Sequence, residues 1–168
     1  FCDQQLGRVL DVFDEHDLWE DTMLLVNTDH GLLMGEHDWW AKVVTPFFQE
    51  IAHIPFWAYD PRNPKETNKK SNALAQTIDL GPTILDYFDI PLTEDMQGKA
   101  IFDFIEDDKE IRKASLYGVM GGQVNVTDGQ YVYMRATTTE DNKPLYDYTL
   151  MPTHMKNRFS PRELQEWE

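Results

Sequence analysis

Four side chains that can bind a metal ion or an anion lie close together in the sequence: Asp29, His30, His37 and Lys42. We refer to these four residues as the 29–42 cluster. An adjacent carboxylate and imidazole can ligate one divalent ion, and a nearby ammonium group can neutralise a bound anion. Asp-His-Gly is also an ordinary polar turn, because its residue types are common in loops. The cluster therefore predicts either a cation-assisted site for an anionic group or a solvated turn.

The charge balance restricts the partners of the chain. It carries 15 Lys and Arg against 30 Asp and Glu, a formal net charge of -15. A phosphate backbone would be repelled, so nucleic acid is not expected as a partner. Residues 1–60 contain two basic residues, Arg8 and Lys42, which sets Lys42 apart in an acidic field. No apolar run is long enough to span a membrane, so no membrane partner is expected either.

The elements around the 29–42 cluster follow an α/β pattern. Apolar residues at helical spacing predict an amphipathic helix that contains Leu6, Val9, Leu10 and Phe13. Residues 22–28 are short and nearly continuously apolar, which is typical of a strand covered on both faces. Because this run leads into Asp29, the cluster is expected at the carboxyl end of an interior strand, where open α/β sheets bind ligands.

Three further elements are expected after the cluster. Thr45-Pro46 has the sequence of an N-cap and a first helical position, which predicts a short helix through Phe47, Phe48 and Ile51. Residues 54–59 predict a second strand. Asp79 with Pro82 predicts the start of another helix, and residues 60–72 between them have the composition of an exposed connection.

From about residue 114 the pattern changes to short strands. They are predicted at residues 115–120, 123–127, 130–136 and 145–150, and Asp128-Gly129 is a hairpin turn signal. We expect an α/β part at residues 1–113 and a small antiparallel subdomain at 114–168. Asn125-Val126-Thr127 has the form of a glycosylation acceptor, but the approach to a hairpin explains it more simply.

Four sequence blocks occur in a fixed order: Asn27-Thr28-Asp29-His30-Gly31, Gly35-Glu36-His37-Asp38-Trp39-Trp40-Ala41-Lys42, Pro46-Phe47-Phe48 and Ile54-Pro55-Phe56. This order resembles the second half of the sulfatase family in the alkaline phosphatase superfamily. There the blocks read much like Ser-Asp-His-Gly, Gly-Glu-His-Gly-Leu-Trp-Gly-Lys, Pro-Phe-Tyr and Val-Pro-Leu. The resemblance covers residues 1 to about 105. It implies an alkaline-phosphatase-like α/β sheet, to which residues 114–168 add a smaller antiparallel sheet.

The resemblance also implies roles for the cluster. Asp29 matches a ligand of the catalytic divalent cation, and His30 matches a neighbouring ligand. Lys42 matches a lysine that contacts the anionic oxygens of the ester, and His37 matches a supporting position near the pocket. Fixed positive charge lowers the barrier for cleaving a sulfate ester, because charge in the transition state lies on its oxygens. Calcium is the expected cation, while the imidazole leaves Mn²⁺ or Zn²⁺ open.

Two features of the family are missing from the residues before Asp29. The first is the nucleophile, a Cys or Ser oxidised to formylglycine in a Cys/Ser-x-Pro-x-Arg motif; the second is an early Asp-Asp metal pair. Cys2 is not in that motif. The chain also lacks a start methionine, so we interpret it as the C-terminal portion of a sulfatase-like hydrolase. By itself it should be inactive, and an exposed sheet edge should favour self-association. The full-length enzyme should cleave sulfate esters of a small molecule or a glycan.

Two alternatives stay open. The Asp29-His30 pair also resembles the phosphonate monoester and phosphodiester hydrolases of the same superfamily. A non-enzymatic domain that binds a glycan through Trp39 and Trp40 is the other alternative, although a net charge of -15 opposes a polyanionic ligand. The two tryptophans are expected either to line a substrate pocket or to anchor the loop.

Overall fold

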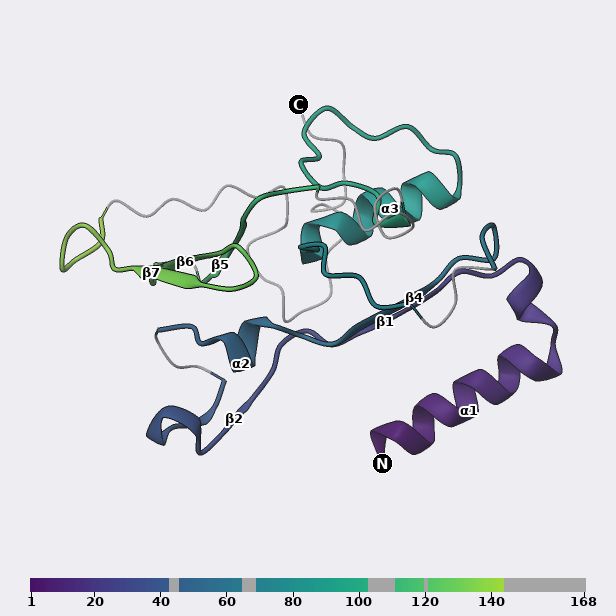
Figure 1. Ribbon diagram of the computed structural model, residues 1–168, viewed down its shortest axis with the longest axis horizontal. Helices are drawn as coiled ribbons and strands as arrows, with labels where there is room; N and C mark the ends of the chain where they lie inside the picture. The colour runs from purple at the N-terminus through teal and green to yellow at the C-terminus, as the bar shows by residue number, and fades with distance from the viewer. Residues whose placement is uncertain (43–45, 65–68, 103–110, 120, 144–168) are drawn as a thin grey trace, which may run out of the picture. The chain divides into compact units, whose positions relative to one another are not determined.

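The computed structural model describes residues 1–42, 46–64, 69–102, 111–119 and 121–143. By their contacts the residues divide into two compact units, Phe1–Ala136 and Thr137–Glu168. The helices and strands named below all lie in the first unit (Figure 1). Across the described residues, no helix combines the length and the hydrophobicity needed to cross a membrane.

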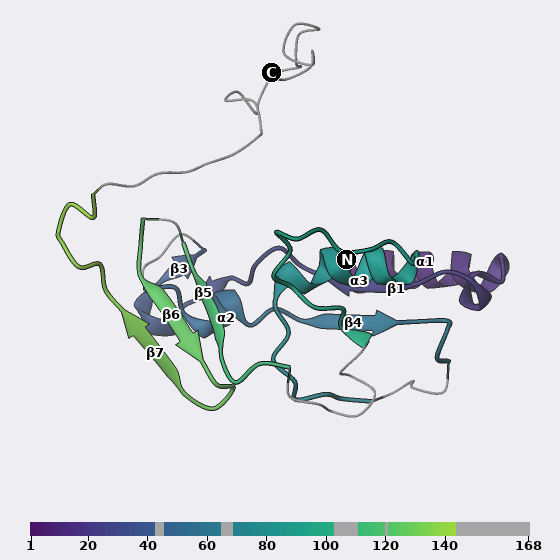
Figure 2. The same ribbon diagram turned by 90° about the horizontal axis from the view of Figure 1, so that it is seen from above.

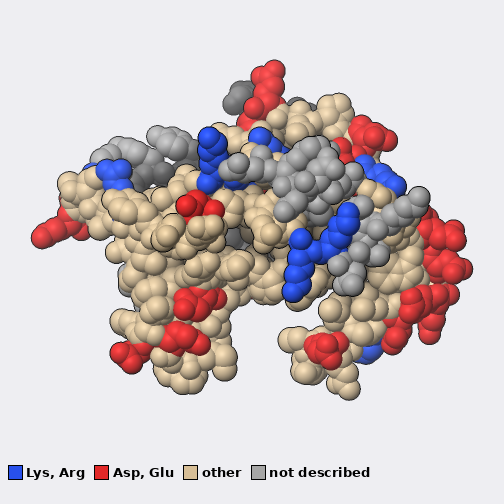
Figure 3. All heavy atoms as spheres, viewed as in Figure 1, with Lys and Arg blue, Asp and Glu red and all other residues tan. Residues whose placement is uncertain are grey.

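Helix α1 (Cys2–Glu15) confirms the predicted amphipathic helix. Phe13 is its buried residue, and the Phe13 ring lies 4.7 Å from that of Trp19 in the short 3-10 helix η1 (Leu18–Glu20). Trp19 in turn meets Tyr59 edge to face at 5.0 Å, and the Tyr59 hydroxyl donates to the Trp19 carbonyl oxygen at 2.7 Å. These aromatic contacts attach α1 to the strand that contains Tyr59. Figure 3 shows acidic side chains gathered over α1 and the turn that follows it.

Strands β1 (Leu24–Asn27) and β4 (Phe56–Tyr59) form an antiparallel pair in which Leu24 lies opposite Tyr59 and Asn27 opposite Phe56. Both predicted strands are therefore confirmed, and they are neighbours. The prediction that the first strand is covered on both faces is wrong for the described residues. There the sheet has two strands, so Leu24, Leu25 and Val26 are only partly buried.

The helix predicted from Thr45-Pro46 begins later than expected. Helix α2 spans Gln49–Ala52 and its N-cap is Phe48, whose extended backbone (φ -68°, ψ 160°) ends the preceding segment. Pro46 therefore precedes the helix instead of starting it, and Thr45 lies outside the described residues. Ile51 of α2 and Leu33 form a buried core on which Phe47 and Phe48 pack. Leu33 belongs to β2 (Leu33–Met34), which pairs with β3 (Trp40–Ala41) around the 3-10 helix η2 (Glu36–Asp38).

The predicted helix at Pro82 is confirmed as α3 (Leu80–Tyr87), preceded by the 3-10 helix η3 (Thr77–Asp79). Asp79 joins the two helices and is completely buried. Its carboxylate accepts two hydrogen bonds of 2.6 Å from the Arg112 guanidinium and one each from the backbone N–H groups of Gln76 (2.7 Å) and Lys99 (3.0 Å). These donors compensate a buried charge that would otherwise be costly.

The predicted C-terminal strands appear as a three-stranded antiparallel sheet of β5 (Ser115–Gly118), β6 (Val124–Thr127) and β7 (Val132–Arg135) (Figure 2). Asp128 and Gly129 lie in the turn between β6 and β7, as predicted, with Gly129 at φ +92°. The Asp128 carboxylate accepts from the backbone N–H groups of Gln130 and Tyr131 at 2.9 and 2.7 Å. The strand predicted at residues 145–150 lies outside the described residues.

Contacts group this sheet with the preceding residues, in the unit Phe1–Ala136. A domain boundary between residues 113 and 114 stays a prediction. Asn125 on β6 is completely buried, and its Nδ2 group donates to the Phe47 carbonyl oxygen at 2.7 Å. The Asn125 amide is thus used in packing, as expected for a strand residue, and is not presented to solvent as a glycosylation acceptor would be.

Candidate functional site

Asp29 and His30 lie on the loop directly after β1, at the carboxyl end of that strand. The Asp29 carboxylate accepts a hydrogen bond from the His30 backbone N–H at 2.9 Å, and its Oδ2 atom lies 3.1 Å from His30 Nε2. The Asp29 side chain is 78% exposed and that of His30 is 30% exposed. The pair therefore faces solvent from a fixed strand end, which is where a ligand could reach it.

The partners of His30 define which ring nitrogen carries the proton. His30 Nδ1 lies 2.9 Å from the Gly31 carbonyl oxygen, which can only accept, so Nδ1 is the protonated nitrogen. His30 Nε2 is then left with its lone pair, and Lys42 Nζ donates to it at 2.8 Å. The imidazole is thus oriented as in a metal-ligating histidine, whose second nitrogen donates to a carbonyl.

The geometry of this pair fits one divalent cation. Ligand atoms about 2.1 Å from an ion and at right angles to each other are separated by about 3 Å. The distance between Asp29 Oδ2 and His30 Nε2, 3.1 Å, matches that separation. No group of three or more His, Cys, Asp or Glu residues converges on a cation position within the described part of the chain. Asp29 and His30 would therefore supply two ligands of a larger set.

The environment of Asp29 favours the charged carboxylate. Desolvation opposes ionisation, but the hydrogen bonds from the His30 backbone N–H and the Thr28 hydroxyl favour the charged carboxylate, and the pKa of Asp29 lies below its ordinary value. The carboxylate is thus ionised at neutral pH, as a cation ligand must be.

Lys42 contacts His30, which in turn contacts Asp29, whereas His37 lies elsewhere in the structure. The His37 ring stacks on Phe48 with centroids 3.8 Å apart and an angle of 7° between the planes. Its Nε2 atom lies 3.1 Å from Oε1 of Glu50 on α2. The described contacts of the His37 side chain go to these two residues, so the structure brings together three of the four residues in the 29–42 cluster.

The backbone of the β2–β3 hairpin explains this separation. Gly35, His37, Asp38 and Ala41 all have positive φ angles, of 118°, 56°, 61° and 85°. Left-handed backbone is strained for residues other than glycine and is often found at functional sites. The turn directs His37 toward α2, and the positive φ of Ala41 sets the direction from which Lys42 leaves the hairpin.

Gly31 connects the Asp29–His30 loop to α2. Its backbone N–H donates to the Ile51 carbonyl oxygen at 2.8 Å. A Cβ atom at Gly31 would lie 1.9 Å from the backbone oxygen of Glu50, so the loop can approach α2 only with glycine at this position. Sequence reasoning did not select Glu50, because nothing in its sequence context separates it from the other acidic residues.

Other side chains of interest lie outside this arrangement. His16 and His53 are exposed, and Cys2 is a free, exposed cysteine. Trp39 and Trp40 are 53% and 70% exposed on the β2–β3 hairpin, which leaves both of their expected roles open. His154 lies outside the described residues.

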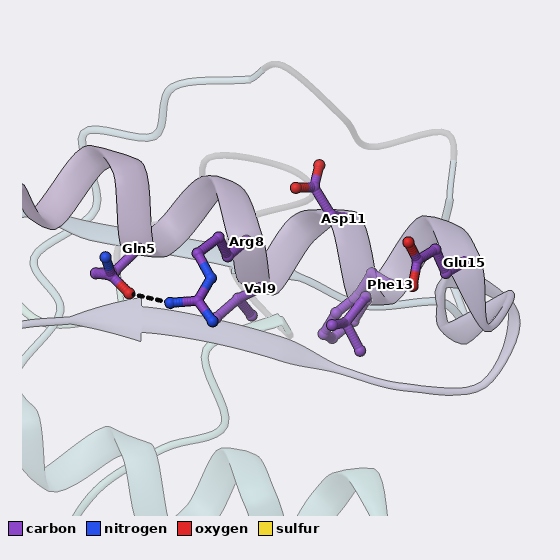
Figure 4. A pocket seen from close by; sticks show the side chains of 7 residues that line it. Gln5, Arg8, Val9, Asp11, Phe13 and Glu15 are labelled. Atoms are coloured by element: carbon purple, nitrogen blue, oxygen red, sulfur yellow. Dashed lines mark hydrogen bonds between the residues drawn. The ribbon is translucent and has the colours of Figure 1, made fainter.

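A shallow groove follows α1 (Figure 4) and is separate from the 29–42 cluster. It is lined by Gln5, Arg8, Val9, Asp11, Val12, Phe13 and Glu15. The cation in this lining, Arg8, donates to Gln5 Oε1 at 2.8 Å. No residue of the cluster lines the groove, so we locate the candidate site by its chemistry at the end of β1.

The chain has an alkaline-phosphatase-like mixed α/β fold. The phosphonate monoester hydrolase of Silicibacter pomeroyi aligns with 80% of this chain at a TM-score of 0.64 and 21% identity, and 30% of that protein is covered. A protein solved in complex with its substrate D-glucosamine-2-N,6-O-disulfate aligns with 86% of the chain at a TM-score of 0.61 and 21% identity, over 31% of its own length. At these identities the likeness concerns the fold.

Within this fold class, the sequence places the chain in one family. Residues 35–168 match the family described as N-sulphoglucosamine sulphohydrolase, C-terminal, and the chain belongs to this sulfatase family as a C-terminal portion. An arylsulfatase of Clostridium perfringens is 30% identical over 69% of the chain, and an ulvan-active sulfatase of Formosa agariphila is 26% identical over 97%. A multifunctional alkaline phosphatase superfamily protein of Trinickia caryophylli is 27% identical over 64% of the chain.

The chain spans 24% of the arylsulfatase, 34% of the ulvan-active sulfatase and 20% of the Trinickia protein. The expected relation to sulfatases, to a C-terminal portion and to an alkaline-phosphatase-like mixed α/β fold is confirmed.

Proposed function

We propose that the full-length protein containing this chain hydrolyses sulfate esters of a small molecule or a glycan with the help of a divalent cation. Family membership supports the class of enzyme, a sulfatase-like hydrolase. The observation that carries the mechanism is the convergence of Asp29, His30 and Lys42. The Asp29 carboxylate lies 3.1 Å from Nε2 of His30, and the Lys42 ammonium group lies 2.8 Å from the same nitrogen.

Each of these side chains has a distinct task in the proposed reaction. Asp29 and His30 would hold the cation through Oδ2 and Nε2, with the Gly31 carbonyl keeping the imidazole in the ligating tautomer. Because Nε2 has one lone pair, the Lys42 ammonium group would then release Nε2 and be free to turn to the ester. A bound cation would polarise the ester oxygens. Lys42 places its ammonium group against the anionic oxygens of the ester, where it stabilises charge that grows in the transition state.

The two proposed ligands restrict the choice of cation. The Asp29 carboxylate suits Ca²⁺, which is our first choice, while the His30 imidazole fits Mn²⁺ or Zn²⁺. The nucleophile, expected to be formylglycine, is not encoded by a Cys/Ser-x-Pro-x-Arg motif in these 168 residues. The chain by itself is therefore expected to be inactive.

A phosphonate monoester or phosphodiester hydrolase is the second candidate. The imidazole of His30 beside Asp29 favours it, because such a ligand set accepts transition metals that also serve phosphoryl transfer. A non-enzymatic glycan-binding domain is the third candidate. It would place a polyanion against a chain of net charge -15, which opposes binding.

The deciding experiment compares matched substrates on the purified full-length protein. Aryl sulfate, aryl phosphonate and phosphodiester substrates are assayed side by side, with the bound metal measured by elemental analysis. We expect the highest kcat/KM for the sulfate ester and one divalent ion per site. A preference for the phosphonate or the diester would instead support the second candidate. Absence of all three activities in the metal-loaded protein would contradict the proposal that the full-length protein is a hydrolase.

A further inference from the structure

Glu50 lies between the two parts of the chain that form the candidate site. Its backbone packs against the Asp29–His30 loop, where the Glu50 carbonyl oxygen leaves room for no more than a hydrogen on Gly31. Its side chain points to the β2–β3 hairpin, where Oε1 meets His37 Nε2 at 3.1 Å. One residue therefore contacts both the loop that holds Asp29 and the hairpin that leads to Lys42.

The hairpin contacts α2 in three ways. Leu33 packs on Ile51 in the buried core, and the His37 ring stacks on Phe48. The third contact is a hydrogen bond between the side chains of His37 on the hairpin and Glu50 on α2. Stacking leaves a ring free to slide in its plane, whereas a hydrogen bond fixes a direction. The carboxylate of Glu50 thus fixes the hairpin laterally.

The charge of Glu50 also acts on Tyr117 of the antiparallel sheet. Burial raises the pKa of Tyr117 on β5, and the negative charge of Glu50 raises it further. The β2–β3 hairpin carries two more acids, Glu36 and Asp38, both exposed. Glu36 is bound to the Met34 backbone N–H at 2.5 Å, and the described contacts of Asp38 are those of its backbone. Glu50 is therefore the acid of this region that joins separate elements.

We propose that Glu50 is a positioning residue for Lys42. By holding His37 it fixes the β2–β3 hairpin, and the hairpin holds the Lys42 ammonium group within 2.8 Å of His30. The inference deepens the proposed function and rests on it for the role of Lys42. The contacts that carry it do not depend on which ester is cleaved.

The test uses three substitutions of Glu50 in the full-length protein. Glu50→Gln keeps an oxygen acceptor at the same reach, Glu50→Asp keeps the charge but shortens the side chain, and Glu50→Ala removes both. Misplacement of a catalytic group by about 1 Å costs up to about 10²-fold in rate. We expect kcat to fall at least about 10-fold for Glu50→Ala and Glu50→Asp, and less than about 3-fold for Glu50→Gln, with KM nearly unchanged.

Asp38→Asn is the matched control. It removes one negative charge from the same hairpin and keeps the shape of the side chain, and asparagine tolerates the left-handed backbone at φ 61°. The control should retain wild-type kcat. If Glu50→Ala stays within twofold of it, or loses activity only in parallel with its melting temperature, the proposal is wrong.

A second measurement separates this inference from the proposed function. Hydrogen exchange is followed at the amides of Asp38 and Trp39, which donate within the hairpin to Gly35 and Glu36. We expect exchange there to be at least about 10-fold faster in Glu50→Ala than in Asp38→Asn. Faster exchange in a protein without sulfate ester activity would support the positioning role of Glu50 and contradict the proposed function. Unchanged exchange would contradict the positioning role of Glu50, whatever the activity of the protein.

Discussion

The Nζ atom of Lys42 lies 2.8 Å from Nε2 of His30, a contact between residues twelve positions apart. Lys42 follows β3 and His30 follows β1, so the contact joins the loop after β1 to the end of the β2–β3 hairpin. The same imidazole nitrogen lies 3.1 Å from the Asp29 carboxylate. A negative, a neutral and a positive group thus converge at one strand end, which is the combination that binding a cation and an anionic ester requires.

Loss of the Lys42 ammonium group should reduce catalysis without removing the metal. In the full-length protein, Lys42→Ala is expected to lower kcat/KM for a sulfate ester by about 10² to 10³, the effect of losing one preorganised donor. Metal content should stay unchanged because lysine is not a ligand. Lys113→Ala removes the same charge at an exposed position and serves as the control. Full activity in Lys42→Ala would refute the assigned role.

Asp29 should behave differently from Lys42, because its carboxylate is a proposed ligand. Asp29→Ala is expected to lower metal occupancy and activity together, and added metal should restore part of both. Elemental analysis and a metal titration of the rate measure this. Asp11→Ala, an exposed acid on α1, should change neither quantity. Retention of both metal and rate by Asp29→Ala would show that the Asp-His-Gly segment is a polar turn.

The elements that local pattern determines could be predicted from the sequence. Helix α1 and strands β1 and β4 have helical or continuous apolar spacing, and the Asp128-Gly129 turn sets the β6–β7 hairpin. Burial of β1 was overestimated, because coverage of a strand depends on neighbours that its own residues do not specify. The start of α2 was misplaced for a related reason: Pro46 is allowed in a first turn but is equally compatible with the extended segment that precedes Phe48.

The sequence predicts which residues belong to the candidate site, but it does not predict how they are arranged. Asp29, His30 and Lys42 were selected from their types and from a resemblance, and they do meet. His37 was grouped with them by proximity in sequence, yet the left-handed residues of the hairpin turn it to Phe48 and Glu50. Positive φ at His37, Asp38 and Ala41 is not visible in the sequence, since few residues other than glycine adopt it and none of these three types requires it. The contact with Glu50 depends on that backbone and was therefore missed.

Glycine at position 31 should be required for the loop to pack on α2. Gly31→Ala would place a Cβ atom 1.9 Å from the Glu50 backbone oxygen, and backbone must shift to relieve the overlap. Overpacking of this kind costs about 1 to 3 kcal/mol in the free energy of unfolding. Gly7→Ala is the control, because nothing lies within 4 Å of its Cβ position on α1. It should stabilise the helix by up to about 1 kcal/mol. Equal stability of the two variants in urea unfolding would contradict the close approach.

The buried ion pair of Asp79 and Arg112 should make stability depend on acid pH. Desolvation raises the pKa of Asp79, but the hydrogen bonds from Arg112 and from the Gln76 and Lys99 backbones outweigh it, so the pKa lies below the ordinary value of 3.8. A carboxyl with a depressed folded-state pKa stabilises the fold above its unfolded pKa, and that contribution is lost as pH falls through the folded pKa. The free energy of unfolding should therefore decline as pH drops below about 4.

Substitution of Asp79 should remove this acid dependence and expose the cost of the unpaired partner. Asp79→Asn leaves the guanidinium of Arg112, whose side chain is 14% exposed, without its counter-charge, and breaking a buried pair costs about 3 to 5 kcal/mol. Asp89→Asn, at an exposed position that already has a left-handed backbone, should leave both stability and its pH profile unchanged. Urea unfolding of both variants and the wild type from pH 2.5 to 7 measures the difference. If the free energy of unfolding of Asp79→Asn still falls at acid pH as much as that of the wild type, other carboxyl groups cause the pH dependence.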